Sequence, residues 1–146
     1  MKKYLLDSSF VIDLLNEMAD NDEEGPALQW LKRNRRARLW ISPVTLAEVL
    51  EGAQDPQAVK AYLGRYGWQG IHRIQAEKAA ARQKHAVSRM GENDAWQAAV
   101  AECMRSRVLT TKASHGSVPL TRTIVSAEPR CDRPLCGASE ASARAR

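Results

Sequence analysis

The chain has 146 residues, of which 44% are hydrophobic, and it carries a formal net charge of +5 at neutral pH. This length suits one domain with a single hydrophobic core. The basic balance favours an anionic partner, either nucleic acid or an acidic protein. No stretch approaches the roughly 20 apolar residues that a membrane-spanning helix needs, so we expect no membrane association.

The cysteine and histidine patterns exclude two further classes of protein. The cysteines are odd in number and form no regular framework, which favours the reducing cytoplasm over a disulfide-stabilised secreted domain. They are Cys103, Cys131 and Cys136. The three histidines are scattered, without the ligand spacing of a zinc site. We therefore expect a cytoplasmic protein without structural zinc.

The first half of the chain predicts two strands that each lead into a helix. Residues 4–6 suit a buried strand that ends at Asp7, and apolar residues recur at helical spacing from Ser8 or Ser9 onward. Asp13 falls within this run, which is therefore not a signal peptide. An acidic loop at 20–26 precedes a helix through Trp30. Residues 38–42 suit a second strand, and a helix then runs to Gly52.

The second half continues the alternation of helices and strands. A helix opens at Asp55-Pro56, a turn follows at 64–70, and residues 71–74 suit a third strand. Helical composition over 75–89 breaks at Gly91, and Asn93 or Asp94 is the expected N-cap of the next helix. Residues 108–111 suit a fourth strand. This order predicts an α/β fold with a parallel sheet that helices cover on both faces.

Composition changes after Lys112. The remaining residues contain no Trp, Phe or Tyr and are rich in Ala, Ser and Arg, with one β-like patch at 123–125. We therefore expect one domain over residues 1–125 and a disordered tail over 126–146.

Three carboxylates fall at positions that suit chemistry. Asp7 ends the first strand, Glu48 lies on the helix after the second, and Asp94 begins the helix before the fourth. Sites in open parallel sheets form at the carboxyl ends of the strands. Acids that share a cleft repel one another, and a hard dication such as Mg²⁺ or Mn²⁺ removes that repulsion. Such an ion supports phosphodiester hydrolysis.

Each acid also has an ordinary structural interpretation. Asp7 and Asp94 could each cap a helix, because Asp is a preferred N-cap residue. Glu48 could be a solvated helix residue, since most Glu side chains are exposed. Spacing alone leaves these alternatives open.

Three segments together resemble a known family. They are LLDSSFVIDLL, ISPVTLAEVLEG and GENDAWQAAVAECMRSRVLTT. In this order and separation they resemble the signature blocks of PIN-domain proteins, above all the VapC-type toxins, over residues 3–112. The resemblance implies a three-layer α/β/α sandwich with a central parallel sheet, and a homodimeric endoribonuclease that uses Mg²⁺ or Mn²⁺.

The resemblance also implies roles for individual residues and a partner. Asp7, Glu48 and Asp94 would be catalytic, metal-binding acids, and Ser9 would hold a metal-bound water or a phosphate oxygen. The implied substrate is RNA, cleaved by the toxin of a type II toxin–antitoxin system that a cognate antitoxin protein neutralises.

One position departs from the family pattern. The family places a fourth acid just after the last motif strand, where this chain has Ala113, and the Phe and closing strand that normally follow are also missing. A catalytically impaired PIN module that dimerises and binds antitoxin or RNA is therefore an alternative. Asp132 is too remote to replace the missing acid, and we expect Asp13 to face solvent.

Three other features of the sequence allow other interpretations. A phosphatase of the haloacid-dehalogenase type also begins with an acid after a first strand, but it needs a second Asp two residues later, where this chain has Ser9. The basic run at 32–38 could follow an RNA backbone, although most charge runs are solvated helix ends. Trp96, close to Asp94, could stack on a base.

Overall fold

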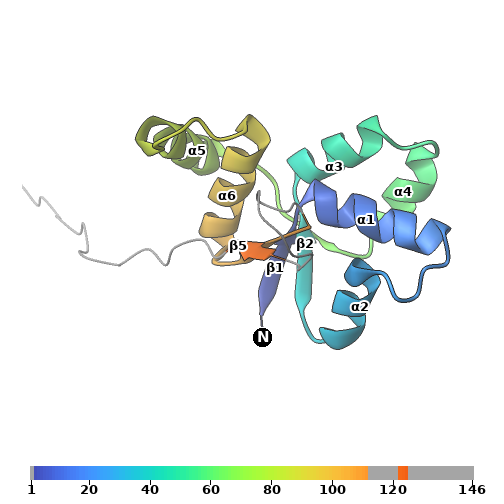
Figure 1. Ribbon diagram of the computed structural model, residues 1–146. Helices are drawn as coiled ribbons and strands as arrows, with labels where there is room; N and C mark the ends of the chain where they lie inside the picture. Colours follow the sequence, from blue (N-terminus) through green and yellow to red (C-terminus); the bar gives the residue numbers. More distant parts are fainter. Residues whose placement is uncertain (1, 112–121, 125–146) are drawn as a thin grey trace, which may run out of the picture.

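The computed structural model describes residues 2–111 and the backbone of a short strand at 122–124 (Figure 1). Ala113, Asp132 and the expected tail at 126–146 lie outside the described residues. The elements in chain order are β1 (Lys3–Leu6), α1 (Ser8–Ala19), α2 (Pro26–Arg33), β2 (Arg38–Ile41), α3 (Pro43–Glu51), α4 (Pro56–Leu63), β3 (Gly67–Trp68), α5 (Arg73–His85), α6 (Glu92–Met104), β4 (Arg107–Thr110) and β5 (Arg122–Ile124).

The strands form one sheet in the order β3-β2-β1-β4-β5. The first four strands are parallel, which confirms the predicted α/β fold. Strand β5 pairs with β4 in the antiparallel direction, with Val108 opposite Ile124. The expectation that a closing strand is missing was therefore wrong: the β-like patch near residue 123 supplies a strand at this edge.

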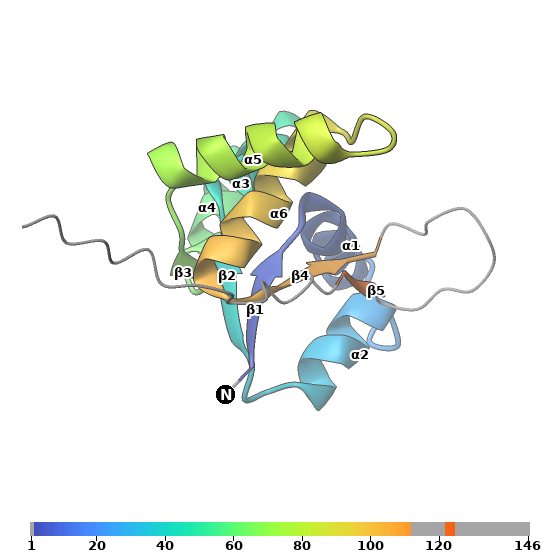
Figure 2. The same cartoon turned by 90° about the vertical axis from the view of Figure 1, so that its left-hand side faces the viewer.

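Alternate residues of the central strand enter two separate cores, one on each face of the sheet. Tyr4 and Leu6 pack with Phe10 and Leu14 of α1 in the larger core. Leu5 points the other way and packs with Val100 of α6 in the smaller core. Helices α1 and α2 accordingly lie on one side of the sheet, and α6 with α5 outside it on the other (Figures 1 and 2). This arrangement is the predicted three-layer sandwich.

A buried carboxylate fixes the start of α2. Glu17 is only 8% exposed. Its two oxygens accept hydrogen bonds from the backbone N–H groups of Ala27 at 2.9 Å and Leu28 at 2.7 Å. A Cβ on Gly25 would lie 2.2 Å from the Glu17 carboxyl carbon. Glu17 belongs to α1, but it accepts the N–H groups of the first turn of α2 as a helix cap would. Gly25 leaves space for its carboxylate.

Helix α5 is held to α6 by a charge cluster on the side away from the sheet. Glu102 of α6 forms ion pairs with Lys78 and with Arg82 of α5, the latter at 2.6 Å. The hydrogen bond from Lys78, reinforced by Arg82, lowers the pKa of Glu102. The carboxylate therefore stays charged in the folded protein under acidic conditions in which an unfolded Glu begins to protonate.

Two local predictions were wrong. The third strand is at Gly67–Trp68 instead of 71–74, and Gly67 pairs with Trp40, whose ring leaves no space for a Cβ at that position. Residues 72–75 instead begin α5, because His72 and Gln75 form a reciprocal capping box. The N-cap of α6 is Gly91 and not Asn93 or Asp94, which both lie within the first turn.

Among residues 2–111 and 122–124, no helix is long and apolar enough to cross a membrane.

Candidate active site

Asp7 lies where β1 ends and α1 begins. Its backbone N–H donates to the carbonyl of Leu109 at 2.9 Å, so the ladder between β1 and β4 continues up to this residue. The residue is 4% exposed. Although Asp7 occupies the N-cap position of α1, its side chain makes no capping hydrogen bond. The carboxylate therefore serves something other than the helix start, which removes the interpretation of Asp7 as a simple cap.

Two hydroxyl groups hold one oxygen of the Asp7 carboxylate. Oδ2 accepts hydrogen bonds from Ser9 Oγ at 2.8 Å and from Thr110 Oγ1 at 3.0 Å. The two hydroxyls also lie 2.8 Å from each other. The other oxygen, Oδ1, accepts no hydrogen bond from any residue in the described part of the chain. The carboxylate is thus oriented through one oxygen and keeps the second for another ligand.

Ser9 is the centre of this small network. Besides Asp7 and Thr110, its oxygen accepts a hydrogen bond from the backbone N–H of Thr111 at 3.2 Å. The serine therefore ties the first turn of α1 to the end of β4. Its predicted contact with a water or a phosphate remains a prediction, and the structure adds a second role, which is to position Asp7.

A buried polar network joins α3 and α6 to the end of β1. Ser42 Oγ donates to Gln97 Oε1 at 3.0 Å, and Gln97 Nε2 donates to Thr45 Oγ1 at 2.6 Å. Thr45 in turn donates to the carbonyl of Leu6, the residue before Asp7, at 2.7 Å. Because Ser42, Thr45 and Gln97 are all buried, breaking one link leaves polar groups unsatisfied. The network fixes both helices against the carboxyl edge of the sheet.

Glu48 and Asp94 sit one helical turn from this network. Glu48 follows Thr45 by three residues on α3, and Asp94 precedes Gln97 by three residues on α6. Residues three apart share a helix face, so both acids lie on the side of their helices that carries the network. Together with residues 91–93 they line an open hollow of about 330 Å³. Glu48 is partly buried and Asp94 is exposed.

Asn93 and Gly91 shape the hollow. Asn93 Nδ2 donates to Glu48 Oε1 at 2.5 Å, which links the start of α6 to α3. A Cβ on Gly91 would lie 3.0 Å from the Asp94 carboxylate, so glycine lets the backbone approach that group closely. The first turn of α6 also holds Glu92, and its N-terminal dipole favours negative charge there.

The structure brings two of the three predicted acids, Glu48 and Asp94, to one hollow and leaves Asp7 outside it. Among residues 2–111, no three acidic, His or Cys side chains gather closely enough to hold a metal ion. The donor set still suits Mg²⁺, which binds one or two carboxylates and keeps several waters instead of requiring a closed protein cage. The residues therefore fit a hard dication held partly through water.

Several residues of the site were missed from the sequence. Thr110 carried a usable signal, because it lies in the strand predicted at 108–111, although its hydrogen bond to Asp7 appears only in the folded protein. Gln97, Thr45 and Asn93 carried none, because polar residues on helices are usually solvated and only the packing of α3 against α6 brings these together.

Comparison with known proteins gives the family of this chain. The family model for the PIN domain matches residues 4–113, about three quarters of the sequence. The chain belongs to the PIN domain family. Asp7, Ser9 and Thr110, which form the Asp7 network, all lie inside the matched range. Comparison with curated protein sequences finds no significant match.

Several solved structures are similar to this PIN domain. A toxin–antitoxin complex from Klebsiella pneumoniae aligns with a TM-score of 0.62 and 26% identity, covering 75% of this chain and 86% of the other. VapBC2 from Rickettsia felis, bound to a promoter DNA fragment, aligns with a TM-score of 0.55 and 19% identity over 75% and 87% of the two chains. VapBC-1 from nontypeable Haemophilus influenzae aligns with a TM-score of 0.50 and 20% identity over 74% and 85%. The last two show similarity of fold alone.

Proposed function

We propose that this PIN domain is a VapC-type toxin that cleaves RNA with the help of Mg²⁺ or Mn²⁺. The observation that carries the proposal is the placement of acids at one edge of the sheet. Asp7 ends β1, and Glu48 and Asp94 share a hollow on the helices that Thr45 and Gln97 tie to the same strand end. The similarity to the toxin–antitoxin complex from Klebsiella pneumoniae supports the toxin assignment.

Residues of the candidate active site would have different roles in such a reaction. The free oxygen of Asp7 and the carboxylates of Glu48 and Asp94 would hold the ion, while Ser9 and Thr110 fix the direction of Asp7. A bound divalent ion would supply positive charge for the phosphate and a water of lowered pKa. Ser9, half-buried beside Asp7, would hold a metal-bound water or a phosphate oxygen.

Two partners belong to the same proposal. The toxin–antitoxin complex from Klebsiella pneumoniae supports a cognate antitoxin protein. A homodimer is proposed from the family resemblance alone.

The direct test is cleavage of RNA by the full chain with and without a divalent ion. We expect single-stranded RNA to be cut in Mg²⁺ or Mn²⁺ and to stay intact in excess EDTA, because the carboxylates alone cannot neutralise the developing phosphate charge. Product bands on a denaturing gel give the readout. Cleavage that continues at full rate in EDTA would exclude the metal mechanism.

A second candidate is a PIN module that binds its partners but turns over poorly. It is favoured by Ala113, which stands where the family has a fourth acid. We expect Ala113→Asp to raise the cleavage rate at limiting Mn²⁺ by about tenfold or more, because an added carboxylate strengthens ion binding. Ala113→Asn is the matched control, since it adds a polar group of the same shape without charge. Robust cleavage by the unaltered chain, with no gain from Ala113→Asp, would exclude this second candidate.

A further inference from the structure

The edge of the sheet opposite the candidate active site is strongly basic. The amino ends of β1, β2 and β4 begin with Lys3, Arg38 and Arg107. A concave cleft of about 590 Å³ lies here, and its charged lining residues are all cations. They are Lys2, Lys32, Arg33, Arg35 and Arg36. A second hollow beside it is lined by Lys2, Lys3, Arg105 and Arg107.

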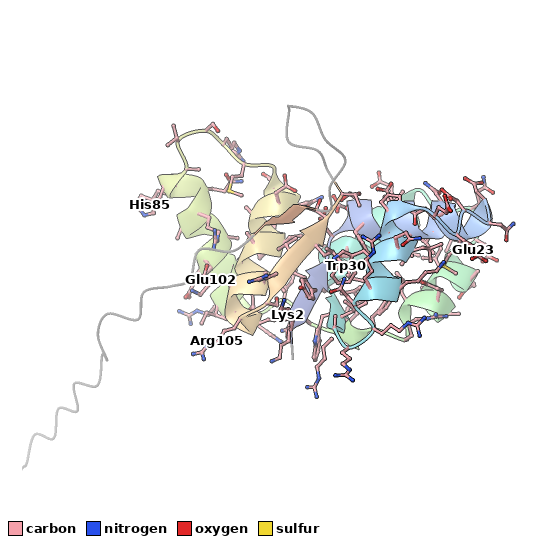
Figure 3. All side chains as sticks on the ribbon, turned by 60° about the horizontal axis from the view of Figure 1, so that its bottom comes forward. Lys2, Glu23, Trp30, His85, Glu102 and Arg105 are labelled. Atoms are coloured by element: carbon pink, nitrogen blue, oxygen red, sulfur yellow. The ribbon has the colours of Figure 1, made fainter. Side chains whose placement is uncertain are left out.

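These cations come from three separate parts of the sequence. The N-terminus, the segment after α2 and the turn between α6 and β4 converge because parallel strands start at the same edge. Figure 3, which turns the lower side of Figure 1 forward, shows Lys2 and Arg105 on this one side of the molecule. The run at 32–38 is therefore not an isolated helix end but one part of a larger surface, which we call the basic face.

The charges of the basic face are largely uncompensated. Lys32 pairs with Glu23 at 3.5 Å. Within the described part of the chain, the other cations that line the two hollows form no ion pair. Like charges that gather on one surface repel one another. The repulsion between these charges therefore lowers the stability of the free protein, and binding of an anionic ligand would relieve it.

Arg105 adds a conformational observation. It ends α6 with φ of 51° and ψ of 46°, the left-handed conformation that glycine adopts most easily. The chain has arginine at this position, and its side chain lines the second hollow. Arg105→Gly would remove the charge and also ease the backbone, so any loss of binding could not be blamed on damage to the helix end.

We propose that the basic face binds the phosphodiester backbone of RNA without reading its sequence. Most of the cations are arginines, whose planar guanidinium groups bind phosphate through two hydrogen bonds. Their spread along a whole sheet edge suits a line of phosphates better than a single anionic group. The choice of RNA as the polymer rests on the proposed function. The face lies one strand length, about 13 Å, from the carboxyl edge with Asp7, so it would anchor a strand away from the point of cleavage.

Binding can be measured without cleavage. The full chain is titrated into a short fluorescent single-stranded RNA of mixed sequence, in EDTA, and anisotropy gives the dissociation constant at several salt concentrations. The test variant is Arg33→Gln/Arg35→Gln/Arg36→Gln. The matched control is Lys60→Gln/Arg73→Gln/Lys84→Gln, which removes the same charge from exposed positions on α4 and α5.

We expect the test variant to bind RNA at least about tenfold more weakly than the control, and its salt slope to fall by about 2, as loss of three phosphate contacts predicts. Arg105→Gly/Arg107→Gln should weaken binding in the same direction. Equal affinity of the test variant and the control would overturn the proposal, as would tighter binding to duplex DNA at equal phosphate concentration.

The result is separable from the nuclease proposal. RNA affinity is measured in EDTA, so it does not depend on a divalent ion at the candidate active site. If cleavage proves independent of Asp7, the basic face still stands. If substitution of Asp7 lowers RNA affinity in EDTA and substitution of the arginines does not, the basic face is refuted, whether or not the protein cleaves RNA.

Discussion

Asp7→Asn is expected to reduce Mn²⁺-dependent RNA cleavage by about 100-fold or more, which corresponds to roughly 3 kcal/mol of transition-state stabilisation. The amide has the shape of the carboxylate, and its oxygen can accept the hydrogen bonds that Ser9 and Thr110 now donate to Oδ2. Its nitrogen would occupy the place of Oδ1, where it cannot bind a cation. The fold should therefore persist while ion binding is lost. Initial rates on a labelled RNA, with circular dichroism of the same samples, measure both.

Asp13→Asn provides the matched control for this experiment. It removes one negative charge from the same helix at a partly exposed position outside the Asp7 network. Its cleavage rate should stay within about twofold of the unaltered chain, since surface substitutions have small effects. Retention of full activity in Asp7→Asn would show that the chemistry does not use this carboxylate.

Glu17→Ala is expected to lower the free energy of unfolding by about 2–4 kcal/mol. The substitution leaves the N–H groups of Ala27 and Leu28 without their present acceptor and opens a void beside Gly25. Helix α2 would lose its fixed start, and with it the support for Trp30, whose ring packs edge-on against Tyr4 at 5.0 Å. Urea unfolding followed by tryptophan fluorescence measures the loss.

Two further variants separate the cap from a general effect of charge. Glu17→Gln keeps one acceptor oxygen, so it should cost less than Glu17→Ala. Glu24→Ala removes an exposed carboxylate from the neighbouring loop and should change stability by less than about 0.5 kcal/mol. A Glu17→Ala protein as stable as Glu24→Ala would contradict the assigned role of Glu17.

The predictable part of the fold is the part that local pattern determines. The short apolar run before Asp7 could only be buried on both faces, and the parallel sheet follows from strands that alternate with helices. The helix after Asp55-Pro56 begins as predicted, because Asp55 accepts hydrogen bonds from the N–H groups of Gln57 and Ala58. These patterns involve residues only a few positions apart, so packing of the rest of the chain does not change the structure that they predict.

The unpredictable part depends on contacts between distant segments. Strand β3 has only two residues, and Gly67 pairs there with Trp40, whose ring lies against it. The residues near position 67 in the sequence do not predict this contact. The N-cap of α6 is Gly91, and the side chain of Asn93 donates a hydrogen bond to Glu48 on another helix. The acids were found through residue type and motif, whereas the hydrogen bonds that orient them, from Thr110 and through Gln97, appear only after packing.

Anomalous diffraction from a crystal grown with Mn²⁺ tests most directly whether Asp7, Glu48 and Asp94 hold one divalent ion together. The expected result is a peak at direct-ligand distance from carboxylate oxygens of at least two of these residues, with the third bound directly or through water. A crystal of Asp7→Asn should show a weaker peak or none. A well-occupied ion elsewhere on the protein, with no density among these three carboxylates, would contradict the assignment.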